Sequence, residues 1–269
     1  MNSSVPGARP SGAAASCFPD GFLGVLMLDT RFPRPVGDIG HPSAFSVPTQ
    51  RCTIRGAWPD EIVQSGAGLR KGRVVTPILQ LVRRLERDGA KAITTSCGFL
   101  VLLQRDMQAQ VKIPVITSSL LQLPGLLAQH QKVGVLTISS SKLGAEHLRA
   151  AGVPRARLGN VVVQGVDAKS EFATAILGNR PEMNLEQAAA DVLAAAVALK
   201  TREPALTCVV LECTNMAPYR VAIEAATGLK TWALVDDERL TRPWKKAVNA
   251  PEASLPPTPI QVINESGAD

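Results

Sequence analysis

Short runs of hydrophobic residues alternate with amphipathic segments along most of the chain. The apolar run 21–28 predicts a buried strand, and the Pro- and Gly-rich stretch 29–48 predicts a long loop after it. Hydrophobic residues at helical spacing predict a helix over 76–89, with Thr76 as N-cap and Gly89 as its end. Further strands of this half are expected at 52–57, 91–97 and 112–118.

The same order of elements recurs in the second half. "LGVLMLD" resembles "VGVLTIS", "AITTSCG" resembles "VVLECTN" and "IPVIT" resembles "LKTWALV", at offsets of about 110–117 residues. Strands are expected at 132–140, 160–166, 205–213 and 229–235, and helices at 141–152, 185–200 (capped by Asn184) and 218–226.

This repetition predicts an α/β protein of two pseudo-symmetric, doubly wound domains, each with a parallel four-stranded sheet. Ligands bind beyond the carboxyl ends of such strands, so an active-site cleft is expected between the domains. The expected limits are a disordered N-terminus at 1–20, a first domain at 21–117 plus 226–250, a second domain at 118–225, and a Pro-rich tail at 251–269.

Composition and charge exclude several classes of partner. The 269 residues are 45% hydrophobic and carry a net charge of +6, but the basic runs 69–73 and 242–246 are short and lack interleaved aromatic residues. No nucleic-acid partner is therefore expected. No apolar run approaches the ~20 residues of a membrane span, and no secretory signal is visible, so we expect a cytoplasmic protein with no membrane partner.

Two of the five cysteines stand at matching places in the two halves. Cys97 and Cys213 each follow an apolar strand, whereas Cys208 lies within one and is expected to be packing. Cys17 and Cys52 are expected to have no role in the site. The odd count and the lack of CxxC spacing argue against a disulfide framework or a zinc site, so neither metal nor cofactor is expected.

Two thiols facing one ligand can invert a carbon atom. One, as thiolate, removes a proton beside a carboxylate, and the other delivers a proton to the opposite face. Backbone N–H groups where strand turns into helix are expected to lower the pKa of both thiols. The residues expected to bind the substrate follow the same strand ends: Asp29, Thr95, Ser96, Gly98, Ser118, Thr137, Ser139, Thr214 and Asn215.

Other polar residues near these motifs have two readings each. Asp38 and His41, in "GDIGHP", are either turn residues or part of the site. Glu212, which precedes Cys213, could modulate that thiol or point into a salt bridge.

"TTSCGFL" and "LECTNM" resemble the aspartate/glutamate/hydantoin racemase superfamily over about residues 21–235. The resemblance implies a cofactor-independent racemase that uses Cys97 and Cys213 as acid and base, assembled as a homodimer or homotetramer. Gly98 and Phe99 after the first cysteine, and Glu212 before the second, depart from the glutamate and aspartate racemases. The "CGF" and "GDI" features are similar to a branch that includes the algal dimethylsulfoniopropionate lyases.

Three hypotheses remain open from the sequence. The first is an amino-acid racemase acting on a small anionic or zwitterionic substrate with a carboxylate. The second is a lyase or decarboxylase on the same scaffold, such as a dimethylsulfoniopropionate lyase, in which α-proton abstraction is followed by elimination. The third is a non-catalytic binder of a small ligand, which would not need paired thiols.

Overall fold

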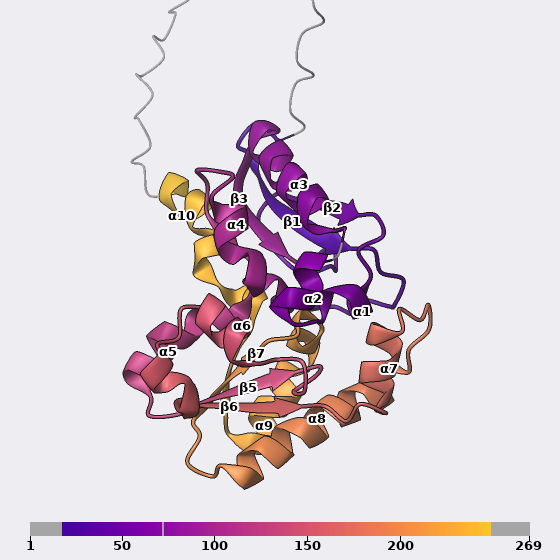
Figure 1. Cartoon of the computed structure of the whole chain (residues 1–269), viewed down its shortest axis with the longest axis vertical. Helices are drawn as coiled ribbons and strands as arrows, with labels where there is room; N and C mark the ends of the chain where they lie inside the picture. The colour runs from indigo at the N-terminus through magenta and orange to yellow at the C-terminus, as the bar shows by residue number, and fades with distance from the viewer. Residues whose placement is uncertain (1–17, 72, 249–269) are drawn as a thin grey trace, which may run out of the picture.

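The computed structural model describes residues 18–71 and 73–248, which form two lobes, each built on its own sheet (Figure 1). The first sheet has the order β2-β1-β3-β4 and the second has the order β6-β5-β7-β8. All pairs are parallel. The first strands are β1 (Phe22–Leu28), β2 (Thr49–Ile54), β3 (Ala90–Thr95) and β4 (Val115–Ile116); the second are β5 (Val133–Thr137), β6 (Val161–Gly165), β7 (Cys208–Leu211) and β8 (Lys230–Trp232).

The two sheets confirm the predicted duplicated α/β architecture. Their strand orders are the same once β1 is matched with β5 and β3 with β7, which are the pairs that the sequence repeats suggested. One boundary is corrected: β8 lies within 226–250, which we assigned to the first domain, yet it pairs with β7 of the second sheet. The chain crosses back later, because Leu234 and Leu240 pack against the first sheet.

The first sheet is buried on both faces, as its apolar strands require. Side chains alternate along β1, so Phe22 and Leu26 face helix α3 (Val75–Arg87) while Leu23 and Val25 face the opposite side. That side is covered by Ile39, Leu234 and Leu240. The 29–48 loop therefore packs onto the sheet, which brings it to the carboxyl ends of the strands.

Local signals explain most helix limits. Asn184 caps α8 (Leu185–Arg202) by accepting from the Gln187 N–H, as predicted, and Gly228 ends α9 (Arg220–Thr227) with φ of 67°. Gly89 has φ of 102° just beyond α3. The prediction for Thr76 was wrong, because α3 already begins at Val75 and makes no side-chain cap hydrogen bond.

The remaining helices are short and connect strands. They are α1 (Pro59–Ile62), α2 (Gly66–Lys71), α4 (Gln104–Gln108), α5 (Leu123–Gln129), α6 (Ala145–Ala150), α7 (Glu171–Leu177) and α10 (Arg242–Val248), with 3₁₀ segments η1 (Gly98–Leu103), η2 (Ser119–Gln122), η3 (Arg155–Asn160), η4 (Thr214–Tyr219), η5 (Leu234–Asp236) and η6 (Glu238–Leu240). None of the helices in the described part of the chain has the length and hydropathy needed to span a bilayer. The predicted tail 251–269, and the predicted disordered N-terminus apart from residues 18–20, lie outside the described residues.

Candidate active site

The two cysteines lie at the switch point of each sheet. Strand order reverses between β1 and β3 in the first sheet and between β5 and β7 in the second, which opens a crevice at the carboxyl ends of those strands. Cys97 follows β3 and Cys213 follows β7. Both line one small cavity between the lobes.

This cavity has a volume of about 20 Å³, room for roughly one water molecule. Its polar lining consists of the two thiols with Thr30, Arg34, Ser96, Glu212, Thr214 and Asn215. Its apolar wall consists of Leu28, Phe32, Pro59, Val63, Phe99, Ile138 and Ile176, with Gly98 between the two sets. Arg34 is the one Lys or Arg among these lining residues, so the cavity offers a single cation.

Both thiols are neutral in this closed arrangement. Burial, followed by the nearby Glu212 carboxylate, raises the pKa of Cys97 to about 12. Burial, followed by Glu212, also raises the pKa of Cys213 well above its ordinary value. Hydrogen bonds from the N–H groups of Phe99, Leu100 and Asn215 act in the opposite direction. The expected lowering was therefore wrong for this state, because the loss of hydration outweighs those hydrogen bonds.

A chain of hydrogen bonds runs from Cys213 to the 29–48 loop. The Cys213 Sγ donates to Oδ1 of Asn215 at 3.6 Å, and Nδ2 of Asn215 donates to Oδ2 of Asp38 at 2.6 Å. Oδ1 of Asp38 accepts from Nη1 of Arg34 at 2.7 Å. Asp38 is thus part of the site's support. His41 does not line the cavity, although its N–H donates to the Asp38 carbonyl at 2.9 Å and its ring contacts Ser43.

A further hydrogen bond joins the two lobes directly beside the cavity. Oγ1 of Thr214 donates to the carbonyl of Ser96 at 2.7 Å, so the residue after the second cysteine binds the residue before the first. This contact is buried, and it fixes the two cysteine-bearing turns relative to each other.

Helix α7 closes the cavity from the second lobe through Ile176. Just beyond its C-terminus, Asn179 adopts φ of 49° and forms hydrogen bonds to the first lobe. Its Oδ1 accepts from the N–H of Arg31 at 2.7 Å, and its Nδ2 donates to the carbonyl of Asp29 at 2.9 Å.

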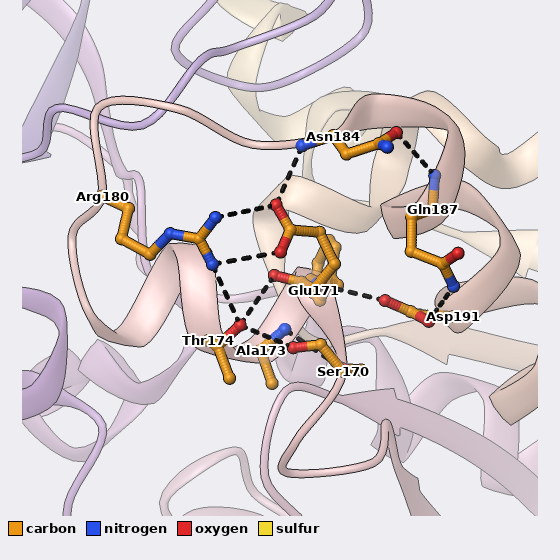
Figure 2. A network of polar contacts seen from close by, with 9 residues as sticks. Ser170, Glu171, Ala173, Thr174, Arg180, Asn184, Gln187 and Asp191 are labelled. Carbon is orange, nitrogen blue, oxygen red and sulfur yellow. Dashed lines mark hydrogen bonds and ion pairs between the residues drawn. The ribbon is translucent and has the colours of Figure 1, made fainter.

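A polar network holds α7 in this position (Figure 2). The Glu171 carboxylate accepts from both terminal nitrogens of Arg180, at 3.0 and 3.1 Å, and from the N–H of Asn184 at 2.9 Å. Asp191 of α8 accepts from the N–H of Phe172 at 3.1 Å. These hydrogen bonds fix α7 to the loop that follows it and to α8. They hold Ile176 of α7 against the cavity.

The cavity brings together six of the eleven residues predicted for the site: Cys97, Cys213, Ser96, Gly98, Thr214 and Asn215. The other five use their polar atoms elsewhere. The Asp29 carboxylate accepts from the N–H of Gly56, Thr95 donates to the carbonyls of Cys97 and Thr117, Ser118 caps η2, Thr137 donates to Glu212, and Ser139 contacts Ser141.

Sequence reasoning missed Arg34 and Phe32, which come from the loop 29–48. Their guanidinium and ring stack at 4.8 Å, which fixes the cation at the cavity. The signal available was one arginine in a loop expected to reach the cleft. Within residues 18–71 and 73–248, no group of three or more His, Cys, Asp or Glu side chains is placed to hold a metal ion.

Residues 59–236 match the family model described as Asp/Glu/Hydantoin racemase. The chain belongs to this family. Among solved members of the fold, a glutamate racemase isoform from Bacillus anthracis superposes with a TM-score of 0.54 at 14% identity, covering 85% of this chain and 82% of the racemase. That likeness supports the fold.

The chain is also similar in sequence to curated dimethylsulfoniopropionate lyases. One from Durusdinium sp. clade D is 27% identical over 234 residues, which cover 84% of this chain and 74% of the lyase. Lyase 7 from Emiliania huxleyi is 28% identical over 224 residues, 77% of this chain and 62% of that lyase. The chain therefore spans about two thirds of the length of these relatives.

Proposed function

We propose that this protein is a cofactor-independent racemase that removes and returns the proton on the carbon next to a carboxylate. The observation that carries the proposal is that Cys97 and Cys213, from equivalent strand ends of the two lobes, line one cavity. A racemase needs an acid and a base on opposite faces of one carbon, and a pair of thiols from two lobes supplies both.

The cavity's single cation indicates the substrate class. Arg34 donates one hydrogen bond to Asp38 and one to Thr30, which leaves other N–H donors of its guanidinium for a carboxylate. A second carboxylate, as in aspartate or glutamate, would meet no second cation in the lining. A small substrate with one carboxylate fits the apolar remainder of the wall better.

Substrate entry requires the lobes to separate. A three- or four-carbon acid is several times larger than one water molecule, so the 20 Å³ cavity represents a closed state. Opening at Asn179 would hydrate the thiols, and closing over a bound anion would exclude water from the reaction.

A lyase is the second candidate, and two observations favour it. The curated relatives are dimethylsulfoniopropionate lyases. Dimethylsulfoniopropionate has one carboxylate for Arg34, and its dimethylsulfonium has no hydrogen-bond donor, which suits the apolar wall that includes Phe99. One thiolate would remove the α-proton, the carbon–sulfur bond would break with its electron pair going to sulfur, and dimethyl sulfide and acrylate would leave.

The test is hydrogen exchange in heavy water. The protein is incubated with neutral and acidic amino acids, hydantoins and dimethylsulfoniopropionate, and α-deuterium uptake, optical rotation and volatile sulfide are followed. Racemisation that both Cys97→Ser and Cys213→Ser abolish supports the racemase, and sulfide release supports the lyase. Cys52→Ser, a half-buried cysteine outside the cavity, is the matched control. Binding without exchange of any substrate would overturn both.

A further inference from the structure

The Glu212 carboxyl occupies the same cavity as the two thiols, and the proposed reaction assigns it no task. Glu212 follows β7, and its N–H still belongs to the sheet through a hydrogen bond to the carbonyl of Leu136 at 2.8 Å. The residue is 1% exposed. A glutamate is almost never buried this completely unless it is paired, so its surroundings call for a physical explanation.

Only one of its two carboxyl oxygens is satisfied. Oε2 accepts from Oγ1 of Thr137 at 2.7 Å, whereas Oε1 is buried with no hydrogen-bond partner among the described residues. No Lys or Arg in the described chain lies within ion-pair distance of either oxygen. A buried oxygen without a partner loses its hydration and gains no hydrogen bond in return, so it needs an explanation, and a catalytic role is one.

The unpaired oxygen lies against the turn that carries the other cysteine. A Cβ placed on residue 98 would collide with both the backbone carbonyl and Oε1 of Glu212. Gly98 is therefore what admits the carboxyl between the two cysteine-bearing turns. Oε1 has Cys213 next to it in the chain and the Cys97–Gly98 turn against it in space.

The Glu212 carboxyl and the two thiols influence each other's protonation, and at rest the proton stays on sulfur, whose pKa is the higher. Burial raises the pKa of Glu212 to about 7, against a smaller lowering by the Thr137 hydrogen bond. A negative Glu212 in turn raises the pKa of Cys97 and of Cys213. A proton that moves from a thiol to this carboxylate leaves the net charge of the cavity unchanged, so it avoids the cost of adding a buried charge.

The other ionisable groups near the site do not take this role. Arg34 and Asp38, both from the 29–48 loop, are paired with each other at 2.7 Å. Tyr219 of η4 faces Asp38 and Cys213, but burial raises the pKa of its hydroxyl to about 12. Glu212 is thus the group in the cavity able to gain and lose a proton near neutral pH.

We propose that Glu212 is the proton-holding residue of this site, which takes the proton from the thiol of Cys97 or Cys213 before the reaction and returns it afterwards. The step requires a thiol S–H to turn towards Oε1, because Oε1 has no partner and Cys213 donates to Asn215 in the closed state. The S–H bond then breaks, its electron pair stays on sulfur as thiolate, and the proton forms an O–H bond at Oε1. The closed cavity excludes bulk water as an alternative acceptor. The inference rests on the proposed proton-transfer chemistry and adds the source of the reactive thiolate.

The experiment compares wild type with Glu212→Gln, which keeps the shape of the side chain and an oxygen to accept from Thr137. We expect a protonated-carboxyl infrared band that titrates near pH 7 in wild type and is missing in the variant. We also expect alkylation of Cys97 and Cys213, followed by mass spectrometry, to shift to lower pH in the variant, because the carboxylate's charge is gone. Both measurements need no substrate.

With an active substrate, Glu212→Gln should lower kcat for α-hydrogen exchange by about 10²–10⁴-fold and remove the limb of the pH profile near 7. Glu212→Asp should restore part of that rate. An unchanged pH profile and alkylation midpoint in a folded Glu212→Gln protein would overturn the inference while leaving a thiol-dependent racemase intact. If no substrate exchanges, the proposed function fails, and the infrared and alkylation results still decide whether the proton is shared.

Discussion

The side-chain amide of Asn215, in the second lobe, donates a 2.6 Å hydrogen bond to the carboxylate of Asp38, in the first. The other oxygen of that carboxylate accepts from Arg34 and from the N–H of Gly40, each at 2.7 Å. Asp38 is 1% exposed, so its charge is compensated almost entirely by these protein groups. Asp38 therefore connects the 29–48 loop and its Arg34 to Asn215, the residue that accepts a hydrogen bond from the Cys213 thiol.

Replacing Asp38 with Ala should lower the free energy of unfolding by about 3 kcal/mol, because Arg34 would keep a largely buried charge without its partner. Urea denaturation measures the change. Asp88→Ala is the control, since Asp88 pairs with Arg84 at 3.3 Å on the surface, with the two side chains 42% and 69% exposed. That variant should cost less than about 1 kcal/mol. Similar losses of unfolding free energy in both variants would contradict the expectation that the buried Asp38–Arg34 pair contributes more to stability than the exposed pair.

Asn179 should control opening of the cavity. Asn179→Gly retains the left-handed backbone, which glycine adopts freely, and removes the side-chain bonds to Arg31 and Asp29. Losing two hydrogen bonds of about 1 kcal/mol each should raise the open population by roughly tenfold or more. Alkylation of Cys97 and Cys213 at fixed pH, followed by mass spectrometry, should accelerate accordingly.

Thr174→Ala is the matched control for the opening experiment. Thr174 lies in α7, just before Asn179 in the chain, and its hydroxyl donates to the carbonyl of Ser170, the N-cap of that helix, and not to the first lobe. Its alkylation rate should stay within about twofold of wild type. Equal acceleration of alkylation in the two variants would mean that opening depends on the stability of α7 and not on the hydrogen bonds of Asn179 to Arg31 and Asp29.

Gly98 should tolerate no side chain. In Gly98→Ala the new Cβ would meet the Glu212 carbonyl oxygen, a backbone atom that cannot move without disturbing the end of β7. We expect a loss of at least about 2 kcal/mol in unfolding free energy. Gly125→Ala in α5 is the comparison, because its Cβ would meet nothing within 4 Å and alanine favours a helix by roughly 1 kcal/mol. A stable Gly98→Ala protein would contradict the close approach described here.

The duplicated fold could be predicted because β1 and β5, and β3 and β7, carry similar apolar runs with the same spacing. The domain limit at 226 failed for a tertiary reason, although the repeat had placed 229–235 in the second half. The three residues of β8 pair with β7, and only the next segment, with Leu234 and Leu240, returns to the first sheet. Local pattern does not show where the chain crosses back.

The site was predicted where the residue type and the strand end coincide, as at Cys97 and Cys213. It was missed where a long loop decides the geometry, as for Arg34. The conformation of 29–48 depends on contacts with Asn215, which is far away in the sequence, and with Met27 of β1, which lies beside Gly40 of the loop. The thiol pKa direction also depended on tertiary structure. Burial and the charge of Glu212 outweigh the N–H groups that the sequence places next to each cysteine.

Glu212 should make the protein less stable as pH rises towards and through neutrality. Burial raises its pKa from an ordinary 4.5 to about 7 in the folded state. Between those values the folded chain binds the proton and the unfolded chain has lost it, so stability is full below pH 4.5 and falls until pH exceeds about 7. The separation corresponds to about 3 kcal/mol.

The measurement is urea denaturation of wild type and Glu212→Gln at pH 5 and pH 8. Other titrating groups contribute equally to both proteins, so the difference between their pH dependences isolates Glu212. Wild type should lose about 2.5 kcal/mol more than the variant between the two pH values, since glutamine has no proton to lose. Parallel pH dependences would mean that burial does not raise the pKa of Glu212 in the folded protein, and the carboxyl would then be ionised at both pH values.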